Sequence, residues 1–118
     1  MNRKPWRLYG LHILDGIEKI RRIQSRGSLS CDVVLFDAAL RNLQTLSEAT
    51  QRLPEELKAV HPEVPWNDIS GFRNILVHDY LGEIDAITVE SIISDHLEPL
   101  RTAVTRMLAL EDPSVKSH

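Results

Sequence analysis

The residues best suited to chemistry in this chain of 118 residues lie within one stretch of eight, residues 73–80. This stretch contains Arg73, Asn74, His78 and Tyr80, which supply a permanent cation, an amide, a titratable imidazole and a phenol. An arginine can bind two phosphate oxygens through its planar fork, and a histidine can transfer protons near neutral pH. The stretch therefore has the groups that a phosphate-handling site uses.

Helical spacing sorts these side chains onto two faces, because successive residues turn by about 100°. One face is mostly apolar and is expected to face the core: Phe72, Ile75, Leu76 and Asp79. The other face carries Arg73, Asn74, Val77, His78 and Tyr80. Asn74 and His78 can touch at a spacing of four, whereas Arg73 and His78 diverge by roughly 140°. A second copy related by a two-fold axis would bring two arginines and two histidines into one cleft, so the spacing favours a dimeric site.

The run Arg73-Asn74-x-x-x-His78-x-Tyr80 resembles the R-x4-H-x-Y motif of the HEPN superfamily, and in particular the HepT-like ribonuclease toxins. Residues 39–43, followed by Ser47-Glu48-Ala49, are similar to the second helix of that family. Residues 61–66, followed by residues 69–74, are similar to its lead-in to the motif. The resemblance covers roughly residues 8–110, nearly the whole chain.

Cleavage of RNA without a metal needs a base for the 2′-hydroxyl proton, an acid for the 5′ leaving oxygen and a cation for the phosphoryl oxygens. His78 can serve as base or acid, Arg73 can clamp the phosphate, and Asn74 can orient His78 or bind the phosphate. The resemblance implies these roles in a metal-independent endoribonuclease, with the site at the interface of a homodimer. Asp79 either caps a neighbouring helix or holds His78, and the sequence leaves both open.

The resemblance also implies a protein partner. HepT-like toxins pair with a small nucleotidyltransferase antitoxin, of the MntA-like kind, that transfers AMP to the motif tyrosine, which is Tyr80 here. The added phosphate would place charge and bulk beside Arg73 and His78, where RNA must bind. Alternatively, Tyr80 is an aromatic residue that packs locally at the end of the helix.

Three functions follow from these patterns. The first is an endoribonuclease toxin of a toxin–antitoxin system, which the resemblance favours. The second is a non-catalytic helical module that binds a nucleotidyltransferase partner or a nucleotide. The third is a structural all-α dimer, in which the same polar residues form a seam at the interface. Cleavage of DNA has no support, because DNA lacks the 2′-hydroxyl and the sequence offers no carboxylates to bind a metal that activates water.

The composition describes an ordinary soluble domain, with 42% hydrophobic and 26% charged residues. A single cysteine, the absence of a long apolar run and the absence of a signal peptide predict a cytoplasmic protein. The net charge of −3 argues against tight non-specific binding of nucleic acid, although a local basic cleft is compatible with it.

Apolar spacing predicts an all-α antiparallel bundle of four main helices and a short one, with no β pattern. The first main helix is expected over residues 8–26, and the second from an N-cap at Ser30 to about residue 53. A short helix is expected over residues 54–60. The third main helix is expected from Trp66 to a stop at Gly82, and the fourth from a cap at Asp85 or Thr88 to about residue 110. Val33, Phe36, Leu40, Leu43 and Leu46 form the apolar stripe of the second main helix. Pro99 is expected to kink or split the last one. Residues 1–7 are expected to be a polar lead, 8–111 a single domain and 112–118 a frayed tail.

The remaining candidates have structural interpretations. Arg21, Arg22 and Arg26 suit the C-terminal dipole of the first helix, with an RNA-binding patch as the alternative. Trp66 is expected to anchor the core and His96 to lie in a core or interface, while Cys31 is expected to be an unreactive thiol. The histidines and the cysteine show no metal-ligand spacing, so neither a metal nor a cofactor is expected.

Overall fold

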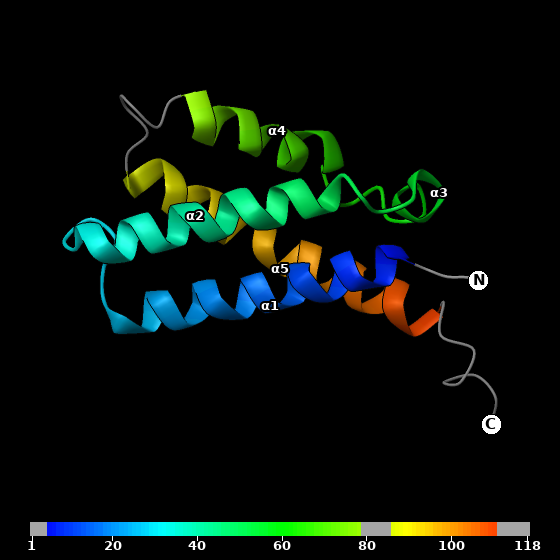
Figure 1. The fold of residues 1–118 in the computed structure, drawn as a ribbon, viewed down its shortest axis with the longest axis horizontal. Helices are drawn as coiled ribbons and strands as arrows, with labels where there is room; N and C mark the ends of the chain where they lie inside the picture. The colour runs from blue at the N-terminus through cyan, green and yellow to red at the C-terminus, as the bar shows by residue number, and fades with distance from the viewer. Residues whose placement is uncertain (1–4, 79–85, 111–118) are drawn as a thin grey trace.

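The computed structural model describes residues 5–78 and 86–110, with side chains for all of these except 73–78 and 110. The described residues form five helices and contain no strand (Figure 1). The helices are α1 (Pro5–Arg26), α2 (Val33–Thr50), α3 (Glu55–Lys58), α4 (Trp66–His78) and α5 (Ala86–Leu110). The predicted all-α class, with four main helices and a short one, is confirmed for this part of the chain.

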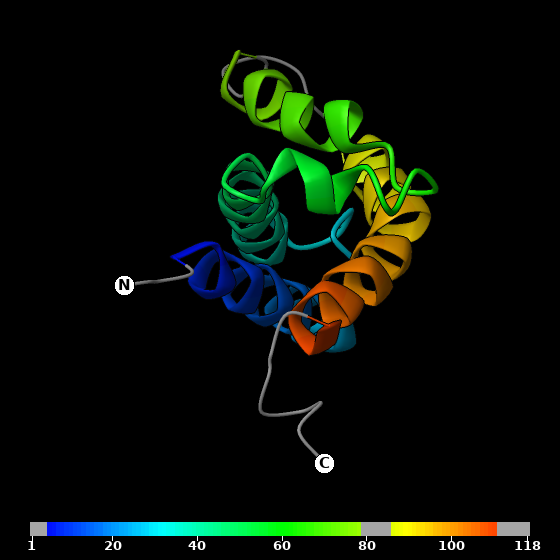
Figure 2. The same ribbon diagram turned by 90° about the vertical axis from the view of Figure 1, so that its right-hand side faces the viewer.

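The four long helices run alternately up and down the bundle. In Figure 1, α1 and α4 run from right to left, and α2 and α5 run from left to right. Viewed from the end in Figure 2, α2 lies between α1 and α4, and it packs against both. Helix α5 packs along α1. The C-terminal end of α4 therefore lies at the same end of the bundle as the α1–α2 connection and the start of α5 (Figure 1).

Apolar stripes at helical spacing bury one face of each long helix. The fully buried side chains include Ile13, Ile17 and Ile20 of α1, Leu43 and Leu46 of α2, Ile69 of α4, and Ile93, Leu97 and Leu100 of α5. Burying each such side chain contributes roughly 1.5–3 kcal/mol. Two glycines let helices approach closely, since a Cβ added at Gly10 would lie 3.3 Å from Leu108 Cδ2 and one at Gly16 would lie 3.4 Å from Leu46 Cδ2.

Helix α1 begins at Pro5, three residues before the predicted start at residue 8. Proline suits the first position of a helix, because it has no N–H to leave unpaired and its φ is already helical. Trp6 is buried, and the Arg7 guanidinium lies 5.7 Å from its ring and donates a hydrogen bond to Leu108 O at 3.0 Å. Contacts with the far end of α5 therefore extend the helix into a segment that has no apolar periodicity. The predicted stop of this helix at Gly27 is confirmed by its φ of +157°.

Helix α2 is capped by Asp32 rather than by Ser30 as predicted. The Asp32 carboxylate accepts hydrogen bonds from Val34 N at 2.9 Å and Leu35 N at 3.3 Å, which pairs two of the free donors of the first turn. The helix ends at Thr50, earlier than the predicted 53. Val33, predicted to belong to the apolar stripe, is 69% exposed, because the first turn of α2 extends past the packed part of the bundle. Cys31 is an exposed thiol just before this cap.

The other predicted boundaries agree with the described residues, except that Thr88 is not the cap of the last helix, because α5 already begins at Ala86. The short helix follows Pro54, residues 61–65 form a loop, and α4 starts at Trp66. Pro99 does not split α5, which continues through it as one helix. The expected stop of α4 at Gly82 and the cap at Asp85 lie outside the described residues, as does the tail 112–118. No helix among the described residues is long and apolar enough to cross a membrane.

Candidate active site

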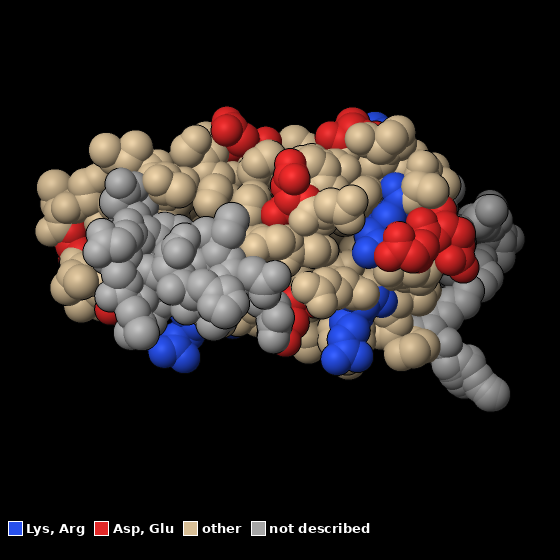
Figure 3. All heavy atoms as spheres, turned by 90° about the horizontal axis from the view of Figure 1, so that it is seen from above, with Lys and Arg blue, Asp and Glu red and all other residues tan. Residues whose placement is uncertain are grey.

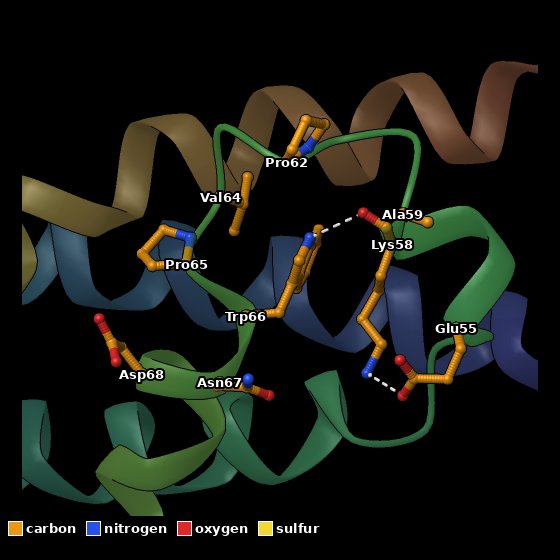
Figure 4. A pocket seen from close by; sticks show the side chains of 9 residues that line it. All are labelled: Glu55, Lys58, Ala59, Pro62, Val64, Pro65, Trp66, Asn67 and Asp68. Carbon is orange, nitrogen blue, oxygen red and sulfur yellow. Dashed lines mark hydrogen bonds and ion pairs between the residues drawn. The ribbon is translucent and has the colours of Figure 1, made fainter.

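Helix α4 carries the predicted motif, and its N-terminal end is fixed by the loop before it. The indole nitrogen of Trp66 donates a hydrogen bond to Lys58 O at 3.0 Å (Figure 4). It donates a second one to His61 O, also at 3.0 Å. The backbone N–H of Ile69 closes the first turn by donating to Pro65 O at 3.0 Å. Trp66 is therefore a structural anchor, as predicted, and it fixes where the motif helix begins.

The first half of α4 has one buried face, as the spacing predicted. Ile69 and Phe72 are buried, whereas Asn67 and Asp68 are exposed. The ring of Phe72 lies 5.4 Å from that of His96 on α5, which ties α4 to the last helix. This contact and the half-buried position of His96 agree with the prediction that this histidine lies in the core or an interface.

The structure places three of the predicted site residues on α4 and leaves two outside its described part. Arg73, Asn74 and His78 lie in the last two turns of the helix, and His78 is its final residue. Asp79 and Tyr80 lie outside the described residues, so their predicted roles stay predictions.

A pocket of about 380 Å³ opens at the other end of α4, between α3 and the loop (Figure 4). Its lining includes Lys58, Trp66, Asn67 and Asp68. The Lys58 side chain is 8% exposed, and its ammonium donates to Thr50 O at 3.3 Å and pairs with Glu55 at 3.1 Å. Lys58 therefore holds the end of α2 against α3. Asp68, the last residue in the lining, precedes His78 by ten residues, which is about 15 Å along the helix axis, so the pocket lies at the opposite end of α4 from His78.

His61, also near the start of α4, forms a local pair with an acidic residue. Its ring is buried, and its Nδ1 lies 3.2 Å from Glu63 Oε2. A backbone hydrogen bond, together with the hydrogen bond and charge of His61, lowers the pKa of the Glu63 carboxyl. Helical spacing could not reveal this pair, since both residues belong to a loop. Among the described residues, no three histidine, cysteine, aspartate or glutamate side chains are placed to hold a metal ion.

The arginines at the end of α1 are partly used in structural ion pairs. Arg21 lies 2.7 Å from Glu98 on α5, and Glu98 lies 3.4 Å from Arg101. Arg22 and Arg26 are exposed. On the face seen from above in Figure 3, the described surface is mostly uncharged, with separate acidic and basic groups and no continuous basic area. Arg21 therefore has a structural role, but through an ion pair with α5 rather than through the predicted interaction with the helix dipole, because Arg26 is the basic residue in the last turn of α1.

Sequence reasoning missed a hydroxyl contact between α2 and α4. Thr50 Oγ1 lies 3.3 Å from Ser70 Oγ, and it donates a hydrogen bond to Ser47 O at 2.6 Å. Ser70 precedes Arg73 by three residues, so this contact lies one helical turn before the motif. The sequence does contain a sign of this contact. Ser47 and Thr50 continue the helical spacing of Leu40 and Leu43, at positions of the helix that are normally apolar, so two hydroxyl groups could have been expected in the core.

Comparisons with known proteins agree on one family. Residues 11–107 match the family described as "Ribonuclease HepT-like". A protein of Caldanaerobacter subterraneus named "Putative RNase TTE0752" is 36% identical over 96 residues, which cover 78% of this chain and 85% of that protein. "Probable ribonuclease HepT" of Thermococcus cleftensis is 30% identical over 71 residues, or 60% of this chain and 64% of that protein. No solved structure matches the chain.

The family match extends from the first half of α1 to the last turns of α5, and it includes the whole of α4. It agrees with the motif resemblance, with the all-α fold and with the expectation of an RNA-cleaving enzyme. The chain belongs to the HepT-like ribonuclease family.

Proposed function

We propose that this ribonuclease is the toxin of a toxin–antitoxin pair, and that it cuts RNA internally and without a metal at a cleft shared by two chains. The observation that carries the proposal is the position of Arg73, Asn74 and His78 in the last two turns of a helix whose start is held by buried and hydrogen-bonded residues. A rigid helix keeps catalytic groups at fixed spacing, which a transition state requires. A protein that acts on cellular RNA would work in the cytoplasm.

The proposed chemistry uses the RNA's own 2′-hydroxyl as the nucleophile. His78 of one chain takes the hydroxyl proton as the 2′-oxygen attacks the phosphorus. The bond from phosphorus to the 5′-oxygen breaks, and His78 of the second chain gives that oxygen a proton. Arg73 balances the charge on the two non-bridging oxygens, and Asn74 orients His78 or holds the phosphate. The products are a 2′,3′-cyclic phosphate and a 5′-hydroxyl.

A homodimer supplies what a single chain lacks. One chain has only one motif histidine, whereas general acid and general base must act on opposite sides of the phosphorus. Arg73 and His78 also diverge by roughly 140° on one helix, so they do not converge on one small group. Two copies of α4 related by a two-fold axis would provide two histidines and two arginines in one cleft.

Tyr80 is the proposed point of control by an MntA-like nucleotidyltransferase antitoxin. Its phenolic oxygen would attack the α-phosphorus of ATP, forming a new phosphorus–oxygen bond as pyrophosphate leaves and the phenolic proton passes to solvent. The attached AMP adds negative charge two residues from His78, which repels the phosphates of RNA. The family membership supports this proposal, because the motif tyrosine is present at the expected spacing.

Incubating total cellular RNA with the purified protein in EDTA tests the function. The wild type is expected to cleave, and His78→Ala is expected to lose cleavage while keeping the size of the wild-type dimer. His12→Ala is the matched control, because His12 is an exposed histidine on α1. Cleavage by His78→Ala at the wild-type rate would contradict the proposed site. Failure of unmodified wild type to cleave any RNA would instead favour the non-catalytic module that binds a nucleotidyltransferase or a nucleotide.

A further inference from the structure

The two helices that flank α4 carry few cations near the end where the motif lies. Helix α2 packs along α4, and α5 is tied to α4 by the contact between Phe72 and His96. Arg41 is the only lysine or arginine in α2, and α5 has none before Arg101, in its second half. A chain with a net charge of −3 has to attract the phosphates of RNA with local cations. Arg41 is the one cation that these two helices offer at that end.

Arg41 lies level with the end of α4. Thr50 of α2 touches Ser70 of α4, with 3.3 Å between the hydroxyl oxygens, and the two helices run side by side in opposite directions (Figure 1). From this contact, Arg41 is nine residues back along α2 and His78 is eight residues on along α4. At 1.5 Å per residue, these steps are about 13.5 Å and about 12 Å toward the same end of the bundle. The backbones of Arg41 and His78 are therefore at nearly the same height.

The guanidinium of Arg41 is exposed and takes no part in holding the fold together. Among the described residues it forms neither an ion pair nor a hydrogen bond. Asp37, four residues earlier, has the spacing at which an acid and an arginine can pair on a helix, yet no ion pair joins the two. Arg21 and Arg101, by contrast, both pair with Glu98. The charge of Arg41 is therefore available to a ligand.

We propose that Arg41 binds a phosphate of the RNA substrate other than the one that is cleaved; the proposal rests on the RNA-cleavage function proposed above. An RNA strand that reaches His78 comes from outside the bundle, and it carries a phosphate at every nucleotide. An exposed guanidinium at the same height on the neighbouring helix can bind one of these phosphates through its fork. Such a contact adds affinity and fixes the position of the strand without reading its sequence.

The other exposed arginines near this end of the bundle are less well placed. Arg22 and Arg26 are exposed on the last turns of α1. Helix α2 lies between α1 and α4, so it separates both residues from the motif helix (Figure 2). Arg41 belongs to the helix that α4 itself contacts.

Binding of a non-cleavable RNA tests the contact without turnover. The probe is a fluorescent single-stranded RNA with 2′-O-methyl groups, which has no free 2′-hydroxyl to react. Arg41→Gln is expected to weaken binding by about fivefold at low salt. It should also reduce the slope of log Kd against log salt by about 0.7, the value for one phosphate contact on a single strand. Arg41→Lys should keep most of the slope, because it keeps the charge. An unchanged slope in Arg41→Gln would overturn the proposal.

Arg52→Gln is the matched control. Arg52 is an exposed arginine just beyond the end of α2, eleven residues from Arg41 and away from His78, and its guanidinium lies 5.5 Å from the ring centre of Tyr9. It makes the same change of charge, so it is expected to leave the slope within error of the wild type. Equal changes of slope in the two variants would contradict a specific contact, since net charge alone would then explain both.

The cleavage assay separates binding from chemistry. Arg41→Gln is expected to raise KM by about fivefold with kcat nearly unchanged, because Arg41 does not touch the reacting atoms. The variant should also elute at the size of the wild type, whereas loss of the dimer would overturn the proposal by placing Arg41 between two chains. A wild type that binds the probe with the expected difference in slope but cleaves no RNA would contradict only the proposed function.

Discussion

The indole nitrogen of Trp66 donates a hydrogen bond to the backbone carbonyl of Lys58, at 3.0 Å, across the loop that leads into the motif helix. The Lys58 ammonium in turn donates to Thr50 O at the end of α2. One lysine thus joins the end of α2 to the start of α4 through both its side chain and its backbone. The direction in which α4 leaves this corner decides where Arg73 and His78 lie.

Replacing Trp66 by phenylalanine should weaken this corner. The change removes the shared donor, but each carbonyl keeps a backbone partner, His61 N for Lys58 O and Val64 N for His61 O. The free energy of unfolding is therefore expected to fall by about 0.5–1.5 kcal/mol, the net contribution of a hydrogen bond. Urea unfolding followed by far-UV circular dichroism measures the loss. Trp6→Phe is the control, because Trp6 is buried and the structure gives its indole no hydrogen bond among the described residues. Equal losses in the two variants would show that ring size, rather than the bonds, is responsible.

Glu98 should make the fold sensitive to acid. The hydrogen bond from Arg21, helped by the charges of Arg101 and Arg21, holds the pKa of Glu98 below its ordinary value of 4.5. The unfolded chain therefore takes up the proton at a higher pH than the folded chain does, so the contribution to stability is present above pH 4.5 and is lost as the pH falls through the folded pKa.

Glu98→Gln is expected to lower stability at pH 7 by less than about 1 kcal/mol, because the pair is partly exposed to solvent. The variant should also lose less stability than the wild type between pH 7 and pH 3.5. Urea midpoints at the two pH values measure both effects, with Glu56→Gln on α3 as an exposed control. An acid slope equal to that of the wild type would show that the Arg21 contact does not influence folding.

Mixed dimers should reveal whether one cleft uses both histidines. If acid and base come from different chains, a dimer with one His78→Ala subunit is inactive. Wild type unfolded and refolded with an equal amount of His78→Ala should then keep about a quarter of its activity per total dimer, the fraction of wild-type homodimers. Activity of about one half would mean that each chain carries an independent site.

Tyr80→Phe should separate catalysis from control. The variant keeps the ring but lacks the phenolic oxygen that would accept AMP, so RNA cleavage is expected to stay near the wild-type rate. After incubation with ATP and the cognate nucleotidyltransferase, the wild type should gain the mass of AMP and lose activity, whereas Tyr80→Phe should do neither. A modified Tyr80→Phe protein would place the acceptor at another residue.

Local patterns predicted the elements of this fold well. The helical spacing of apolar residues and the positions of the prolines were enough to find the short helix after Pro54, the loop over residues 61–65 and the start of α4 at Trp66. The motif with its tyrosine, together with the similar segments over residues 39–49 and 61–74, was enough to identify the family. These features depend on residues that are close in sequence, so a single chain contains the information.

Features that depend on distant contacts were missed. Contacts with α5, a hundred residues away in sequence, extend α1 back to Pro5. Lys58 looks like a solvated lysine in the sequence, but the end of α2 buries it. The bond between Ser70 and Thr50 depends on how α2 and α4 are aligned, which neither helix determines alone. The exact ends of the helices and the contacts between them, including the contacts that hold the motif helix, therefore depend on the neighbouring helices.

The most direct test of the central claim is to map the ends of the RNA fragments that the purified protein produces in EDTA. The account predicts 2′,3′-cyclic phosphate and 5′-hydroxyl ends from the wild type, and no fragments from His78→Ala. An RNA with a single 2′-deoxynucleotide on the 5′ side of the cut should resist cleavage there. Fragments with 3′-hydroxyl ends, or cleavage at the deoxy position, would contradict the account, because the nucleophile would then not be the 2′-hydroxyl.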